Sequence, residues 1–144
     1  MFRSKSIRML VCDMVGTTIQ EKGIVYNSLY KTVKLIKPKL MKSEIEQFSG
    51  YNKLEVIKYF VEQQKMDSPT TVINNLDSEF NYYLKKEYSN NASVKLIHPA
   101  LLPYFNVLRY NDIKICLNTG YNKDIQNLLI DKLAQADAPI EVIK

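Results

Sequence analysis

The sequence lacks the features that define several classes of protein. It contains no run of about 18 apolar residues, the length that a membrane-spanning helix needs. It has only two cysteines, whose spacing fits neither a metal site nor a disulfide scaffold. Its single histidine, His98, cannot form a metal cluster or a catalytic triad alone. We therefore expect a soluble protein that has no membrane partner.

An export signal is also missing from the first residues. They are basic, but the apolar run that follows stops at Asp13 and is too short for the core of a signal peptide. Cys12 and Cys116 both lie within apolar runs, where free thiols are commonly buried. We expect a cytoplasmic protein.

The composition is that of an ordinary globular chain with an excess of basic residues. Its 144 residues, 46% hydrophobic and 24% charged, fit one domain or a small domain with an insertion. The net charge of +5 raises the alternative of a nucleic-acid partner, but no DNA- or RNA-binding motif is present, so a solvated helix face is the favoured interpretation and no nucleic acid is expected. The clustered lysines behind this alternative are Lys31, Lys34, Lys37, Lys39 and Lys42.

Two short apolar runs, each followed by polar turn residues, predict buried strands. Residues 7–12 precede Asp13, and residues 113–117 precede Asn118. Helical spacing fills the chain between and after them, and residues 140–143 have the pattern of a third strand. Helices are expected at about 25–36, 43–46 (with Ser43 and Glu46 as a capping box), from 53 onward, from Pro69 to about 88, 99–108 and 123–133.

This order of elements predicts an α/β fold. Parallel strands need helical crossovers between them, and the chain supplies them. We expect residues 1–20 and 92–144 to form a partial parallel sheet with its helices, and residues 21–91 to form an inserted all-helical cap.

The carboxyl ends of the two strands are the candidate site, because ligands of parallel sheets bind there. A carboxylate such as Asp13 can attack phosphorus and hold a metal ion, the amides of residues 15–18 can cradle phosphate oxygens, and Thr119 can donate a hydroxyl. The alternative is that Asp13 and Thr18 merely cap the next helix. Spacing alone leaves both interpretations open.

Three segments resemble one family. Asp13-Met14-Val15-Gly16-Thr17-Thr18 resembles the first motif of phosphonoacetaldehyde hydrolase and the phosphonatase-like branch of the haloacid dehalogenase (HAD) superfamily. Residues 114–121, with Asn118-Thr119-Gly120-Tyr121, are similar to its second motif, and Gly50-Tyr51-Asn52-Lys53 to the loop of its helical cap. The matches have the expected order and span nearly the whole chain, so the resemblance implies a partial HAD-like Rossmannoid sheet with a helical cap.

The resemblance also implies roles for individual residues. Asp13 would be the nucleophile, and Mg²⁺ would be held by Asp13 and the backbone carbonyl of Val15. Lys53 would form a Schiff base with an aldehyde substrate, as the cap lysine of phosphonoacetaldehyde hydrolase does. The remaining implied contacts are Gly16, Thr17, Thr119 and Gly120 for phosphate, and Tyr121 for the substrate pocket.

The sequence departs from the family in two respects. Val15 replaces the second aspartate of ordinary phosphatases, and valine cannot transfer a proton. The basic residue and the acidic pair that follow in the family do not occur before Lys144, which suggests a C-terminally truncated chain with a weak Mg²⁺ site. We expect little turnover of a small phosphorylated or phosphonate metabolite, and an exposed strand edge that self-associates or binds a partner chain. The alternative is a non-catalytic remnant that binds phosphate or a protein.

Overall fold

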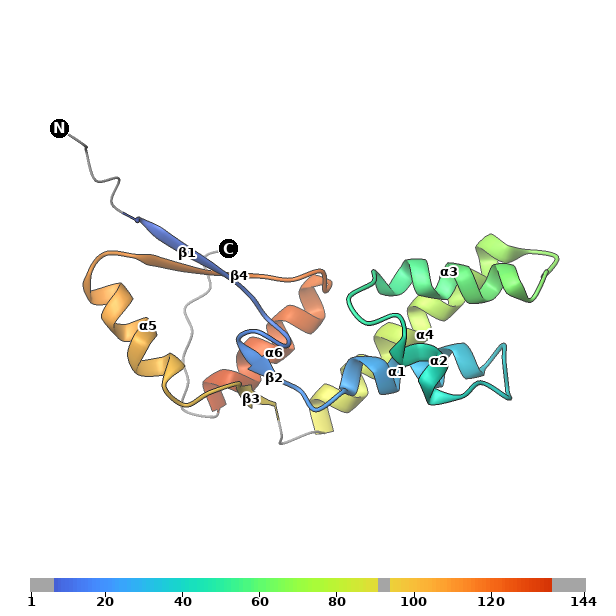
Figure 1. The fold of residues 1–144 in the computed structure, drawn as a ribbon, viewed down its shortest axis with the longest axis horizontal. Helices are drawn as coiled ribbons and strands as arrows, with labels where there is room; N and C mark the ends of the chain where they lie inside the picture. The colour runs from blue at the N-terminus through green and yellow to red at the C-terminus, as the bar shows by residue number, and fades with distance from the viewer. Residues whose placement is uncertain (1–6, 91–93, 136–144) are drawn as a thin grey trace. The chain divides into compact units, whose positions relative to one another are not determined.

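The computed structural model describes residues 7–90 and 94–135, which form two compact units. The first unit consists of the described parts of Met1–Lys22 and Ala92–Lys144, and the second of the described part of Gly23–Asn91. Figure 1 labels the helices and strands of both units. Each unit has its own buried core.

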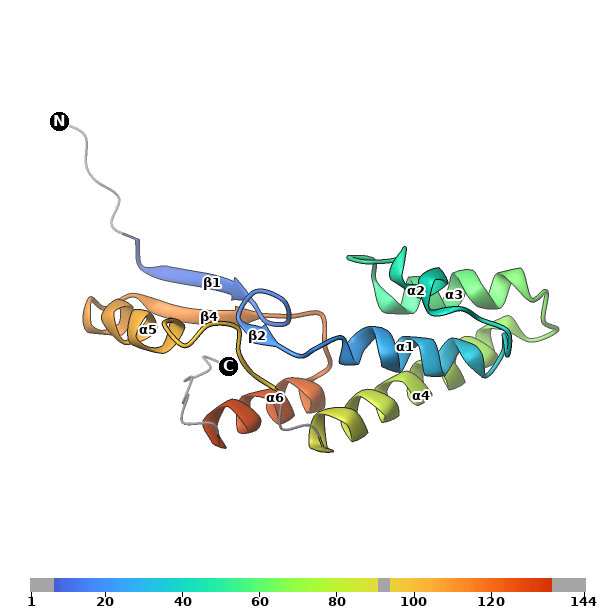
Figure 2. The ribbon, with the colours of Figure 1, turned by 60° about the horizontal axis from the view of Figure 1, so that its bottom comes forward.

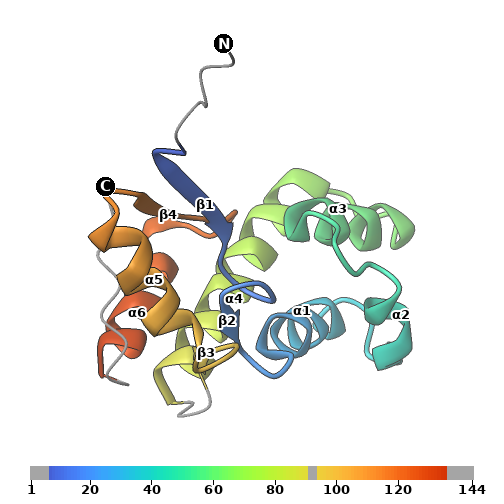
Figure 3. The same cartoon turned by 60° about the vertical axis from the view of Figure 1, so that its left-hand side comes forward.

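The first unit is built on two parallel strands. β1 (Met9–Asp13) pairs with β4 (Lys114–Asn118), as the sequence predicted. Helices α5 (Leu101–Tyr110) and α6 (Lys123–Gln135) lie on one side of this pair (Figure 3). The predicted α/β architecture with parallel strands is therefore confirmed. Its buried apolar side chains are Met14, Ile19, Val94, Phe105, Ile115, Ile125, Leu129 and Leu133.

Side chains along β1 alternate in burial. Leu10 and Cys12 are half-buried, whereas Met9, Val11 and Asp13 are exposed. β1 pairs only with β4 among the described residues, so one of its edges offers unpaired backbone groups. An apolar side chain such as Val11, at 57% exposure, thus lies on an open strand.

A second, antiparallel pair of strands was not predicted. β2 (Ile19–Gln20) pairs with β3 (Lys95–Leu96), and the Ile97 N–H extends the pairing by donating to the Thr18 carbonyl at 2.9 Å. Strands of two residues are too short to show the alternation on which strand prediction depends. The pair joins the chain segments that lead into and out of the second unit.

The second unit contains four helices and no strand among its described residues. They are α1 (Ile24–Lys34), α2 (Lys42–Glu46), α3 (Lys53–Gln63) and α4 (Pro69–Asn90). α1 packs along the long helix α4 (Figure 2), and α3 also packs against α4. The apolar stripes of the helices face one another, which buries the side chains of Leu29, Val33, Ile57, Val61, Leu84 and Tyr88.

Local signals at the helix ends are partly as predicted. Asn52 caps α3 by accepting the N–H groups of Leu54 (2.9 Å) and Glu55 (3.3 Å). The capping box predicted for Ser43 and Glu46 is wrong. The N-cap of α2 is Met41, two residues before Ser43, so Glu44 occupies the third helical position and its carboxylate accepts the Met41 N–H at 2.9 Å.

Two sequence predictions remain: the absence of a membrane-spanning helix and a strand at residues 140–143. No helix in the described ranges 7–90 and 94–135 is both long and apolar enough to cross a membrane. The strand predicted for residues 140–143 lies outside these ranges.

Candidate functional site

Asp13 is the last residue of β1, and its side chain is exposed. The Thr17 hydroxyl lies 3.5 Å from its Oδ2, and the Thr18 hydroxyl donates to its backbone carbonyl at 2.7 Å. Thr18 is thereby committed to the turn, whereas the Asp13 carboxylate faces solvent. Asp13 is therefore accessible to an electrophile at the carboxyl end of the strand.

The turn after Asp13 is closed by its own backbone hydrogen bonds. Gly16 has φ +89°, a left-handed conformation that favours glycine. Its N–H donates to the Ile19 carbonyl at 2.9 Å, and the N–H groups of Thr17 and Thr18 donate to the Met14 carbonyl at 3.4 and 2.8 Å. The amides of Gly16, Thr17 and Thr18, which were expected to be free to bind phosphate, thus already donate within the turn. Phosphate binding by the Gly16 or Thr17 amide would require that amide to give up its present partner.

Asn118 was not among the site residues predicted from the sequence. The parallel register places it opposite Asp13, and its carbonyl accepts the Met14 N–H at 3.1 Å. Its exposed amide side chain therefore sits at the same sheet edge as the carboxylate. Aligning the two predicted strands by their polar ends would have found this residue.

Thr119 follows directly and begins the loop to α6. Its Oγ1 accepts the Tyr121 N–H at 3.3 Å, which leaves its own O–H proton available for donation. Tyr121 is half-buried, and its carbonyl accepts the Gln126 side-chain amide at 2.8 Å. Gly120 is exposed. The loop is thus fixed by local bonds, and Thr119 directly follows Asn118, the residue that pairs with Asp13.

The loop ends at the start of α6, where Asn122 accepts the Ile125 N–H at 3.1 Å. Amide groups at a helix start carry partial positive charge and favour anions. Asp13 and Asn118 thus face each other at the carboxyl ends of the two strands, and the chain continues from there through Thr119 to the start of α6.

The oxygen atoms at this edge fit Mg²⁺ only in part. Asp13 supplies a carboxylate, and the Val15 carbonyl and the Asn118 amide are further oxygen donors in the same region. In the described part of the chain, no group of three or more His, Cys, Asp or Glu residues could hold a metal. Mg²⁺ prefers six oxygen ligands, so water would have to supply most of them.

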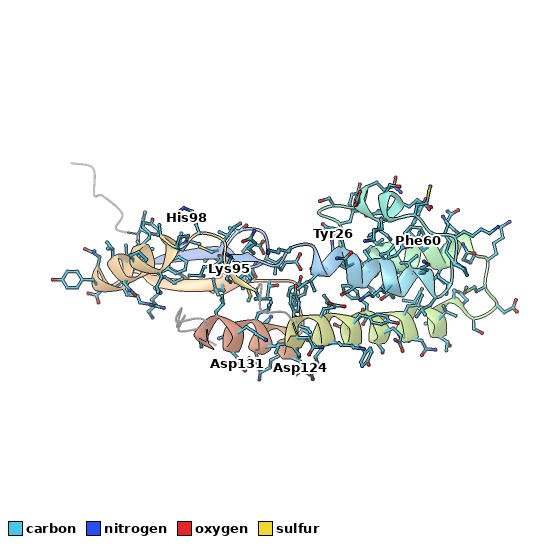
Figure 4. All side chains as sticks on the ribbon, turned by 90° about the horizontal axis from the view of Figure 1, so that it is seen from below. Tyr26, Phe60, Lys95, His98, Asp124 and Asp131 are labelled. Carbon is cyan, nitrogen blue, oxygen red and sulfur yellow. The ribbon has the colours of Figure 1, made fainter. Side chains whose placement is uncertain are left out.

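Lys53 belongs to the second unit, where it is the first residue of α3. It is half-buried, its Nζ donates to the Tyr51 carbonyl at 2.7 Å, and it lies 4.8 Å from the centroid of the Tyr26 ring. Tyr26 projects from the first turn of α1 (Figure 4). The amine is therefore held against an aromatic face and is not a freely rotating surface lysine.

A pocket of about 300 Å³ lies beside Tyr26 in the same unit. Its walls combine apolar surface with amide, carboxylate, hydroxyl and phenol groups, which suits a small polar molecule. It is lined by Gly23, Tyr26, Asn27, Glu46 and Ser49.

Comparison with solved structures identifies the fold. A HAD hydrolase of family IA, variant 3, from Entamoeba histolytica is 17% identical, with a TM-score of 0.69 over 92% of this chain and 57% of that one. A provisionally named phosphatase from Clostridium difficile is 16% identical, with a TM-score of 0.65 over 97% and 61%. A HAD family hydrolase from Deinococcus radiodurans, solved with bound phosphate and sodium, is 17% identical, with a TM-score of 0.52 over 96% and 57%. The fold is that of the HAD hydrolases.

The chain spans about three-fifths of the length of the solved structures that it resembles. No family model and no curated protein matches its sequence. The structural similarity confirms the predicted HAD-like fold class. Because the sequence identities are only 16–17%, the similarity shows the fold and not the activity.

Proposed function

We propose that the carboxyl edge of β1 and β4 binds the phosphoryl group of a small phosphorylated or phosphonate metabolite. Asp13 attacks phosphorus, the bond from phosphorus to the leaving group breaks, and water later releases phosphate from the aspartyl-phosphate. The observation that supports this most directly is the register that sets Asp13 opposite Asn118 with Thr119 following. The Deinococcus hydrolase of the same fold was solved with bound phosphate, which agrees with a phosphate ligand.

The same geometry indicates a slow catalyst. Mg²⁺ held by Asp13 and the Val15 carbonyl would offset charge on the phosphoryl oxygens, but neither residue supplies a fixed positive charge. Loss of one preorganised charge-stabilising donor lowers kcat by about 10²- to 10³-fold in comparable sites. We therefore expect the 144-residue chain to bind phosphate and to form the acyl phosphate without appreciable turnover.

The test separates binding, phosphorylation and turnover. Phosphate affinity is measured by calorimetry with and without Mg²⁺, covalent phosphorylation by the mass increase after treatment with acetyl phosphate, and turnover by phosphate release. The adduct should be cleaved by hydroxylamine and absent in Asp13→Asn. Asp112→Asn is the matched control, because Asp112 carries the same charge just before β4 begins, at the opposite end of the strand. It should behave as the wild type.

Each other result has a definite meaning. Phosphate binding that Thr119→Val weakens, without any adduct on Asp13, would favour the alternative of a non-catalytic phosphate-binding module. Absence of both binding and adduct would refute the site. Rapid phosphate release that Asp13→Asn abolishes would show that another group supplies the missing positive charge.

The phosphonate branch of the proposal depends on Lys53. Its amine would form a C–N bond to an aldehyde carbon as the carbonyl oxygen leaves as water, and the resulting imine would withdraw electrons from the carbon–phosphorus bond. The support is its half-buried position over the Tyr26 ring. Borohydride reduction in the presence of a small aldehyde should trap the adduct on Lys53 faster than on Lys34. Equal trapping on both lysines would refute this role.

A further inference from the structure

Tyr26 contacts two residues of the loop between α2 and α3 and the first residue of α3. Its hydroxyl oxygen accepts the Gly50 N–H at 3.3 Å and lies 3.3 Å from the Ser49 hydroxyl, with which it shares a hydrogen bond. The Lys53 ammonium group lies over its ring. One side chain on the first turn of α1 thus contacts both ends of the segment from Ser49 to Lys53.

Backbone hydrogen bonds also hold this segment, from the Ser49 N–H to the Glu46 carbonyl and from the Tyr51 N–H to the Phe48 carbonyl, both at 3.1 Å. Gly50 has φ +83°, so the turn depends on a residue without a Cβ. The ring of Phe48 packs against that of Tyr51, with centroids 5.8 Å apart, and against Phe60 at 5.6 Å (Phe60 is labelled in Figure 4). Backbone bonds and aromatic packing therefore fix the flanks of the loop, and the Tyr26 hydroxyl accepts the Gly50 N–H at its centre.

We propose that Tyr26 is the positioning residue for Lys53, and that its hydroxyl anchors the Ser49–Asn52 loop while its ring holds the ammonium group. Its catalytic consequence rests on the proposed imine chemistry of Lys53. The structural coupling between the two side chains does not depend on that chemistry and is tested separately.

Electrostatics provides a readout that a purely structural tyrosine would not give. Burial by itself raises the pKa of the Tyr26 phenol, but hydrogen bonds from Ser49 and Gly50 and the positive charge of Lys53 together lower that pKa below its ordinary value of 10.0. Glu46 lines the pocket beside Tyr26, and its negative charge would act on the Tyr26 pKa in the opposite direction to that of Lys53. Removing Lys53 should therefore raise the pKa of Tyr26.

Tyr30 is a matched control on the same helix. The amine of Lys34 lies 5.3 Å from its ring centroid, and it donates to the Tyr30 hydroxyl at 3.2 Å. Tyr30 therefore also pairs with a lysine over its ring, but it lies one helical turn away from Tyr26. The variants Tyr30→Phe and Lys34→Met therefore show what loss of a phenol hydroxyl or of a lysine charge does elsewhere on the same helix.

The first experiment is a titration of carbon-13-labelled tyrosine rings by NMR in the full chain. In Lys53→Met the pKa of Tyr26 should rise, and in Lys34→Met it should stay at the wild-type value. Amide exchange at Gly50 should accelerate about threefold to tenfold in Tyr26→Phe, the factor expected for one neutral hydrogen bond, and should not change in Tyr30→Phe. An unchanged Tyr26 titration in Lys53→Met, or unchanged exchange at Gly50 in Tyr26→Phe, would overturn the proposal.

The second experiment tests the consequence for chemistry. The rate of aldehyde trapping on Lys53 should fall about threefold to tenfold in Tyr26→Phe and remain unchanged in Tyr30→Phe. Normal coupling by NMR without preferred trapping on Lys53 in the wild type would reject the imine role while leaving the Tyr26–Lys53 pair intact. Preferred trapping that persists at full rate in Tyr26→Phe would reject the positioning role alone.

Discussion

Asp13 and Asn118 lie opposite each other at the carboxyl ends of β1 and β4. Asn118→Asp should place a second carboxylate next to the first and raise the affinity for Mg²⁺, because hard cations prefer charged oxygen ligands. It should weaken phosphate binding through like-charge repulsion. Titration calorimetry with MgCl₂ and with phosphate measures both effects. Asn106→Asp, which makes the same change on the exposed surface of α5, should alter neither, and equal effects of the two variants would show that Asn118 is not at the site.

Replacement by alanine should destabilise the fold more at Gly16 than at Gly120. A Cβ would meet no atom within 4 Å at either position, so the two differ in backbone conformation and not in space. Because φ is +89° at Gly16, Gly16→Ala should destabilise the fold by about 1–2 kcal/mol. Gly120→Ala should be neutral or should stabilise the fold by up to about 1 kcal/mol, because alanine lowers the conformational entropy of the unfolded chain. Urea unfolding followed by circular dichroism measures both, and equal losses would contradict the conformational explanation.

The open edge of β1 should make the 144-residue chain prone to self-association. Val11 is 57% exposed on this strand, and Val11→Lys should reduce association, because charge on an edge strand opposes strand pairing between molecules. Light scattering over a concentration series measures the effect. Val107→Lys is the control, because Val107 is 59% exposed but lies on α5, where the backbone is already paired. Equal improvement in both variants would indicate general surface hydrophobicity as the cause.

Glu44 should make the helical unit sensitive to acid. A hydrogen bond from the Lys37 ammonium group and one from the Met41 N–H lower the pKa of Glu44 below its ordinary value of 4.5, against a smaller opposing effect of burial. A carboxyl whose pKa is depressed by folding stabilises the fold above its unfolded pKa, and this contribution is lost as pH falls through the folded pKa. Glu44→Gln should therefore be less stable than the wild type at neutral pH, and the two should converge below about pH 4.5.

Thermal unfolding at a series of pH values measures this convergence. Lys37→Met should converge with the wild type in the same range, because it removes the partner that lowers the pKa most. A stability difference between wild type and Glu44→Gln that stays constant from neutral pH to well below 4.5 would contradict the assignment.

The sequence by itself determined the parallel strands, the helices and the candidate positions at the strand ends. These features have local signals: apolar runs ending in Asp13 and Asn118, helical spacing, Pro69 and the Asn52 cap. The capping box at Ser43 failed because the alternative cap at Met41, two residues earlier, also has a glutamate three residues further on, and the contact of Glu44 with Lys37 was not visible in the local pattern.

Only the tertiary structure decided which residues meet. The facing of Asp13 and Asn118 depends on the register between strands about 100 residues apart, and the two-residue pair β2 and β3 depends on the same kind of distant contact. The structure also revealed that the Gly16–Thr18 amides bond within their own turn, and that the Tyr26 hydroxyl reaches Gly50, 24 residues further along the chain. Hydrogen bonds and ring contacts between distant residues leave no periodic signal in the sequence, because they arise from how the elements pack and not from the order of residues within any one of them.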